Sequence, residues 1–174
     1  MRYHYLILLV LSLFFSSCIK VNKPRPVRDK YKDYSQRLIE INRYLVKKDQ
    51  EIIAEFVKRK GWNMHPDSTG LWYEILDQGT GSYPKDGDEV VIDYRVELLN
   101  GKICYSSDSL GEMSFKINHS NVIRGVNDGV QKLRVGGKGR FIIPPYLGYG
   151  LLGDQKCIPP RAIILYYITL KSIK

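Results

Sequence analysis

The final third of this 174-residue chain places proline pairs, glycines and tyrosines at close spacing. Ile143-Pro144-Pro145 leads to Tyr149 and Gly150, and Ile158-Pro159-Pro160 follows soon after. Proline fixes φ and has no backbone donor, so each proline pair is expected to end a strand. Apolar side chains with a few hydroxyl and amide donors suit a pocket that excludes water. The three histidines show no ligand spacing, so a metal site is not expected.

Four short patterns follow one another in order along this region. They are V-I-x-G from Val122, V-G at Val135, I-P-P-x-L-x-Y-G from Ile143, and I-P-P-x-A from Ile158. Their order and spacing resemble the FK506-binding (FKBP) type of peptidyl-prolyl isomerase, and the resemblance covers about residues 70–174. Within that family, the residues Cys104, Tyr105, Met113 and Val126 at pocket positions resemble those of bacterial lipoproteins of Bacteroidetes, including members associated with gliding motility.

The resemblance implies catalysis of rotation about X-Pro peptide bonds, with no cofactor and no metal. Amide resonance sets the barrier, and the uncatalysed step takes about tens to hundreds of seconds. The planar amide is more polar than the twisted one, so a pocket that excludes water lowers the barrier. A few fixed donors then stabilise the rotating carbonyl.

Matching the family motifs residue by residue implies a catalytic set of Tyr94, Ile123 and Tyr149. The Ile123 amide and the Tyr149 hydroxyl are the implied hydrogen-bond donors to substrate. The same matching implies a substrate-binding wall of Cys104, Tyr105, Met113, Phe115, Val122, Val126, Ile158 and Tyr166. Each residue alone would also suit ordinary core packing, and their joint placement favours a pocket.

The predicted pocket departs from the family pattern at several positions. Cys104 and Met113 stand where the family has phenylalanines, Tyr105 replaces an aspartate, and Val126 replaces the tryptophan of the pocket floor. Valine buries less area than tryptophan and offers no flat face to a proline ring. We therefore expect weaker catalysis. The alternative function is a non-catalytic chaperone or scaffold module with the same fold.

Cys104 and Cys157 are the two cysteines that follow Cys18 in the sequence. An exported compartment permits a disulfide, and the family alignment implies that both lie near the pocket rim. Two free, buried thiols are the favoured expectation, and a disulfide is the alternative.

The N-terminus has the parts of a secretory signal, with Arg2 before an apolar core over residues 6–15. Ser16-Ser17-Cys18 then resembles a bacterial lipobox. We expect residues 1–17 to be a lipoprotein signal peptide and Cys18 to carry lipid. An ordinary signal peptide with an incidental cysteine is the alternative. Lipidation would hold the protein in the cell envelope, with the periplasmic face of the outer membrane as the expected location.

Positive charge is concentrated between the signal and the predicted sheet. Residues 20–60 carry 13 Lys and Arg against 6 Asp and Glu, whereas residues 61–174 carry 13 against 12. Residues 18–32 are predicted to be an extended linker, because Lys23-Pro24-Arg25-Pro26 is stiff. Residues 33–61 are predicted to form a basic amphipathic helix, with an apolar stripe of Leu38, Ile41, Leu45, Ile52 and Phe56.

The function of this predicted helix can be interpreted in several ways. Its positive charge would suit binding to an anionic membrane surface beside a lipid anchor. Alternatively, the charged side chains only form a solvated face of the helix. Its apolar stripe packs on the rest of the chain or pairs with a second copy as a homodimer. The expected partners are proline-containing exported polypeptides, and nucleic acid is not expected.

After the helix the apolar pattern changes to period two, which is typical of strands. The predicted strands are 71–76, 89–98, 103–105, 113–117, 138–143 and 163–172, and residues 125–133 are a predicted short helix. We expect an α+β domain over residues 70–174, in which a half-open antiparallel sheet wraps around the short helix, as the resemblance implies.

Overall fold

The computed structural model describes residues 27–174. The predicted signal peptide, Cys18 and most of the predicted linker lie outside the described residues. The chain divides after Glu40 into two compact units. Among the helices of residues 27–174, none combines the length and the apolar character that crossing a membrane requires.

Helix α2 spans Val27–Lys60. It begins earlier than the predicted start at residue 33, so the prediction of an extended linker up to residue 32 is wrong for its last residues. Lysine, arginine and tyrosine continue a helix without supplying an apolar stripe, which is why the periodicity misses this first turn. The predicted stop is confirmed, because Gly61 has a φ of 65° and its amide bonds to the Lys58 carbonyl.

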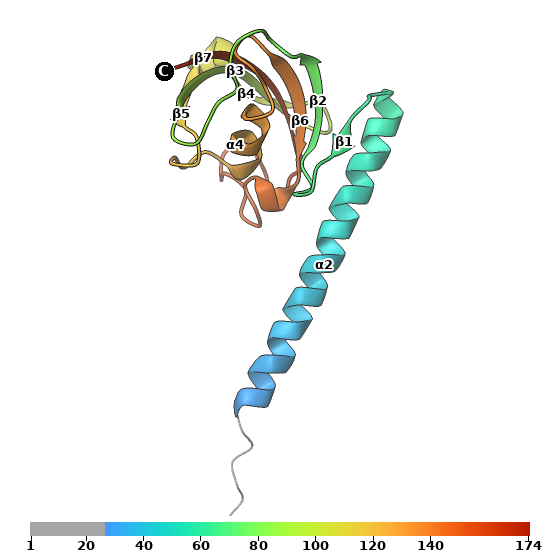
Figure 1. The fold of residues 1–174 in the computed structure, drawn as a ribbon. Coiled ribbons are helices and arrows are strands. Elements are labelled where there is room, and N and C mark those ends of the chain that lie inside the picture. The colour runs from blue at the N-terminus through green and yellow to red at the C-terminus, as the bar shows by residue number, and fades with distance from the viewer. Residues whose placement is uncertain (1–26) are drawn as a thin grey trace, which may run out of the picture. The chain divides into compact units, whose positions relative to one another are not determined.

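The strands form one antiparallel sheet in the order β1-β2-β6-β7-β3-β4. Their bounds are β1 His65–Pro66, β2 Trp72–Asp77, β3 Glu89–Leu98, β4 Ile103–Ser106, β5 Met113–Lys116, β6 Lys138–Ile143 and β7 Ile164–Ile173. Strand β3 pairs with β7 along one edge. Along its other edge, β5 pairs with the first half of β3 and β4 pairs with the second half. The predicted half-open antiparallel sheet around a short helix is confirmed (Figure 1).

Helix α4, Arg124–Val130, lies in the hollow of the curved sheet (Figure 1). Two glycines allow this close packing on β6. A Cβ at Gly125 would lie 2.4 Å from the Ile143 side chain, and one at Gly129 would lie 3.0 Å from the Phe141 ring. Such contacts leave no room for a larger residue, so the glycines set the distance between helix and sheet.

Alternation along the strands separates two apolar cores. On β7, Ile164, Tyr166 and Ile168 face the core that contains α4. Leu165 faces the opposite side, where a smaller core contains Ile53 and Phe56 of α2. The last turns of α2 therefore cover the outer face of the sheet, and the hollow face remains for α4 and the loops.

Three short elements are not predicted by the sequence. They are β1, His65–Pro66, α3, Ser107–Leu110, and the 3-10 turn η1, Pro145–Leu147. A two-residue strand and single helical turns are too short to show a period. The turn η1 begins at a proline, which suits the first position of a helical turn because that position needs no amide donor.

Candidate functional site

The eleven residues that the sequence predicts for the pocket all belong to the core in the hollow of the sheet. Tyr94, Phe115, Val126, Ile158 and Tyr166 are buried within it. Cys104, Tyr105, Met113, Val122, Ile123 and Tyr149 are partly buried and pack against it. The structure thus brings together side chains from the four strands β3, β4, β5 and β7, the start of α4 and the loop after η1. Their roles toward a substrate stay predictions.

Tyrosine rings form one side of this cluster. Tyr94 on β3 and Tyr166 on β7 lie on neighbouring strands, with ring centroids 6.5 Å apart and an interplanar angle of 30°. Burial raises the pKa of both phenols, and the nearby Tyr149 phenol adds to this effect. These hydroxyls therefore stay protonated across the physiological range, where each can donate a hydrogen bond.

The predicted amide donor precedes α4. Ile123 is half-buried and extended, with φ −59° and ψ 144°, and its carbonyl accepts the amides of Val126 and Asn127. Among the hydrogen bonds of residues 27–174, none uses the Ile123 N–H as donor. This amide therefore has no protein acceptor among the described residues, and its role as a donor to a substrate carbonyl stays a prediction.

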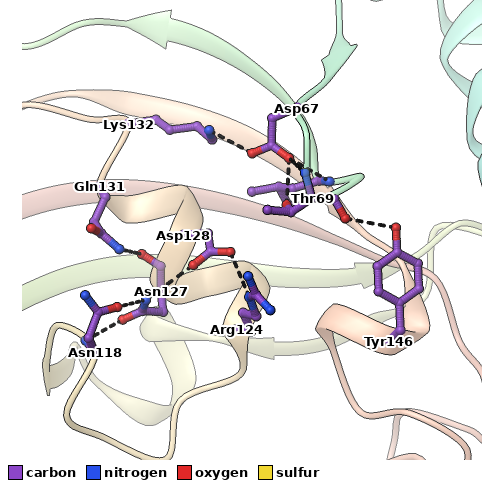
Figure 2. A network of polar contacts seen from close by, with 10 residues as sticks. Asp67, Thr69, Asn118, Arg124, Asn127, Asp128, Gln131, Lys132 and Tyr146 are labelled. Carbon is purple, nitrogen blue, oxygen red and sulfur yellow. Dashed lines mark hydrogen bonds and ion pairs between the residues drawn. The ribbon is translucent and has the colours of Figure 1, made fainter.

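A polar network holds α4 in place (Figure 2). Asn127 is buried, and its side chain exchanges two hydrogen bonds with Asn118, at 2.8 and 2.6 Å. Just beyond the helix, Lys132 pairs with Asp67 at 2.8 Å. Buried polar groups with complete hydrogen bonding fix one arrangement, so these contacts set the position of the helix that carries Val126.

Val126 occupies the position that the family pattern gives to the tryptophan of the pocket floor. Its exposed fraction is 0%, so its neighbours cover it completely. Its side chain is therefore part of the packed core. The smaller side chain has thus been accommodated by packing.

Cys104 and Cys157 form a disulfide across 53 residues of sequence. The favoured expectation of two free thiols is therefore wrong. Their Cα atoms are 5.5 Å apart, because β4 runs beside the loop that follows η1. Sequence spacing cannot reveal such a pairing, since the fold alone brings the two segments together.

The next residue of β4 makes a second link to the same loop. The Tyr105 hydroxyl donates to the Asp154 carboxylate. The hydrogen bond to Asp154 raises the pKa of Tyr105, and burial adds to it. Sequence reasoning missed Asp154, because a single aspartate in a loop between Gly153 and Cys157 carries no pattern of its own.

The cluster supplies apolar walls, several phenols and the Ile123 amide. Within residues 27–174 no group of three or more side chains is arranged to hold a metal ion. The arrangement suits the binding and desolvation of a small apolar group with a carbonyl beside it.

A sequence profile of the family described as FKBP-type peptidyl-prolyl cis-trans isomerase matches residues 81–171. The chain belongs to this family. The sequence-based identification of an FKBP-type isomerase is thus confirmed, and the matched range includes all eleven predicted pocket residues, from Tyr94 to Tyr166.

Two relatives and one solved structure illustrate the similarity. The FKBP-type peptidyl-prolyl cis-trans isomerase FkpA of Escherichia coli K12 is 37% identical over 128 residues, which are 73% of this chain and 46% of that protein. FK506-binding protein 1 of Dictyostelium discoideum is 33% identical over 106 residues, which are 60% of this chain and 99% of that protein. The crystal structure of FkpA from Escherichia coli superposes with a TM-score of 0.64 at 28% identity, covering 100% of this chain and 83% of that one.

The bacterial relative is longer than this chain. The chain spans about half the length of FkpA from Escherichia coli K12. The similarity therefore establishes the FKBP family and its fold for this chain.

Proposed function

We propose that this chain catalyses the cis-trans isomerisation of X-Pro bonds in exported polypeptides while it is held to a membrane through Cys18. The observation that carries the proposal is the gathering of all eleven pocket residues in one cluster on the hollow face of the sheet. The cluster includes the donor groups as well as the apolar walls.

The proposed mechanism needs no nucleophile. Apolar walls such as Phe115 and Ile158 remove water from the X-Pro amide, which disfavours its polar planar form. The Tyr149 hydroxyl and the Ile123 N–H then donate to carbonyl oxygens of the twisted peptide. Because these groups are already held by the fold, they need little rearrangement when the amide rotates.

The tether rests on the sequence before the described residues. An apolar stretch leads to Ser16-Ser17-Cys18, and residues 20–60 carry a net charge of +7. A lipid on Cys18 with basic residues beside it combines two membrane signals, which a stable anchor needs. The resemblance to Bacteroidetes lipoproteins supports the same proposal, with the periplasmic face of the outer membrane as the location. The gliding-motility association stays a prediction.

A second candidate function is a non-catalytic binding module. Val126 is fully covered, and the Tyr105 hydroxyl is engaged by Asp154. The cluster therefore offers neither the flat tryptophan face nor the aspartate at position 105 that the family pattern implies. Such a pocket would hold a proline-containing segment as a chaperone or scaffold without accelerating its isomerisation.

Helix α2 supports a proposed homodimer. The apolar side chains Leu38, Ile41 and Tyr44 recur at helical spacing, and each is exposed. Two copies that paired along this stripe would remove these side chains from water. Light scattering of the purified protein at several concentrations tests this proposal directly.

NMR exchange spectroscopy separates catalysis from binding. A peptide with one X-Pro bond gives separate cis and trans signals, because uncatalysed exchange takes about tens of seconds or longer. A catalytic amount of this protein is expected to produce exchange cross-peaks between them. Shifted peptide signals without such cross-peaks would favour the binding module instead.

A further inference from the structure

The loop that follows Tyr149 closes on itself. We refer to residues 150–161 as the pocket loop. At its base the Arg161 amide donates to the Gly150 carbonyl at 2.9 Å, and the Gly150 amide donates to the Pro145 carbonyl at 2.8 Å. Ile158 points from this loop into the core and is buried. The loop therefore supplies one wall of the cluster, and Tyr149 directly precedes it.

Asp154 organises the tip of the pocket loop. Its Oδ1 accepts the backbone amides of Lys156 at 2.9 Å and Ile158 at 2.8 Å. Its own amide donates to the Ile158 carbonyl at 3.0 Å. At Gly153, φ is 68° and a Cβ would lie 2.2 Å from the same carbonyl, so the chain folds tightly here. Three hydrogen bonds thus connect Asp154 to its own loop, and two of them involve a pocket residue.

The second carboxylate oxygen of Asp154 contacts strand β4, outside the pocket loop. Its Oδ2 accepts the hydroxyl of Tyr105 on β4. Burial alone would raise the pKa of the Asp154 carboxyl, but hydrogen bonds from Tyr105 and the loop amides outweigh it and lower the pKa below its ordinary value. The carboxylate is therefore ionised, and it accepts charge-assisted bonds from both walls at once.

We propose that Asp154 is a positioning residue for the isomerase site, because it holds Tyr105 of β4 and Ile158 of the pocket loop in a fixed relation across the cluster. The inference rests on the proposed function and adds a residue that the motif matching does not assign. The aspartate that the family carries at position 105 is absent, and a carboxylate from the pocket loop lies against the tyrosine that replaces it. The neighbouring Cys104–Cys157 disulfide links the same two segments covalently.

The disulfide makes the proposal testable by mutation. Because Cys104–Cys157 still joins β4 to the pocket loop, loss of the Asp154 side chain leaves the two segments attached. The test compares the full chain with its Asp154→Ala, Asp154→Asn, Tyr105→Phe and double Asp154→Ala/Tyr105→Phe variants. Lys156→Ala is the matched control, since Lys156 is an exposed residue of the same loop tip.

The first measurement is kcat/KM in a protease-free isomerase assay. Asp154→Ala is expected to lower it about three- to tenfold, the range for one or two net hydrogen bonds. Asp154→Asn keeps one acceptor oxygen for the loop amides but not the second for Tyr105, so it should recover part of the activity, while Lys156→Ala should match the wild type. The double variant should be no worse than Asp154→Ala alone, because both changes remove the same contact. Additive losses, or an Asp154→Ala variant with wild-type kcat/KM, would overturn the proposal.

The second measurement is amide hydrogen exchange, which does not depend on activity. Asp154→Ala is expected to speed exchange at the Lys156 and Ile158 amides, with the sheet amides unchanged. Unchanged exchange at these two amides would overturn the proposal. A wild type without catalysis would contradict the proposed function alone, and the exchange result would then decide whether Asp154 holds the loop.

Discussion

The hydroxyl of Tyr149 is the group on which the proposed mechanism depends most directly. Tyr149 is half-buried near Tyr94 and Tyr166 and packs against the core in the hollow of the sheet. Tyr149→Phe keeps the ring and removes one donor, which is worth about 0.5–1.5 kcal/mol net. We expect kcat/KM to fall about two- to tenfold with little change in melting temperature. Full activity in a stably folded variant would remove Tyr149 from the site.

Val126 allows a second test at the scale of single residues. Its side chain is completely buried, so a tryptophan in its place has no space to enter. Val126→Trp is expected to destabilise the protein by about 1–3 kcal/mol through overpacking and to leave kcat/KM unimproved. Urea unfolding and the isomerase assay measure both effects, with Val126→Ile as the milder control. Higher activity at unchanged stability would mean that the floor is open after all.

At the scale of elements, helix α2 contacts the base of the pocket loop. Asp49 of α2 is buried and accepts two hydrogen bonds from the Arg161 guanidinium, both at 3.0 Å. Gln50 beside it donates to the Tyr146 hydroxyl at 3.1 Å and accepts the Trp72 indole N–H at 2.6 Å. The end of α2 is therefore part of the structure that supports the site.

Asp49→Ala tests this support. The change leaves the Arg161 charge without its partner, and we expect a loss of about 1–3 kcal/mol in unfolding free energy. Glu51→Ala is the matched control, since the exposed Lys47–Glu51 pair at 3.9 Å should contribute less than about 1 kcal/mol. Equal losses of unfolding free energy in the two variants, measured by urea unfolding, would show that the Asp49–Arg161 contact stabilises the fold no more than the exposed Lys47–Glu51 pair.

The sequence predicted the long elements best. Strands β3 and β6 have the predicted bounds, because glycine or proline residues lie close to both ends of each apolar segment. The start of α2 was missed because its first turn has no apolar stripe. The single turns α3 and η1 are too short to produce a period.

The candidate site was predictable as a set of positions and not as a set of contacts. Motif matching found Tyr94, Tyr149 and the other cluster members, because their order along the chain is itself the signal. The Cys104–Cys157 disulfide and the Tyr105–Asp154 bond join residues about fifty positions apart. Neither leaves a local pattern, so only the folded chain reveals them.

At the scale of the whole molecule, the proposed location depends on Cys18. Cys18→Ser removes the acceptor for lipid, and we expect the protein to leave the membrane fraction or to keep its unprocessed signal. Fractionation with immunoblotting measures both outcomes, and Cys104→Ser serves as a cysteine control that leaves the N-terminus intact. A processed, membrane-bound Cys18→Ser protein would contradict the lipobox interpretation.

The central claim is that this folded chain accelerates rotation about an X-Pro bond. The most direct measurement is the isomerisation rate of a proline-containing peptide with the fragment 21–174, which begins after Cys18. We predict that the rate rises in proportion to protein concentration above the uncatalysed value, which corresponds to about tens to hundreds of seconds. A rate that stays at the uncatalysed value at every concentration, in a fragment that circular dichroism reports as folded, would contradict the account.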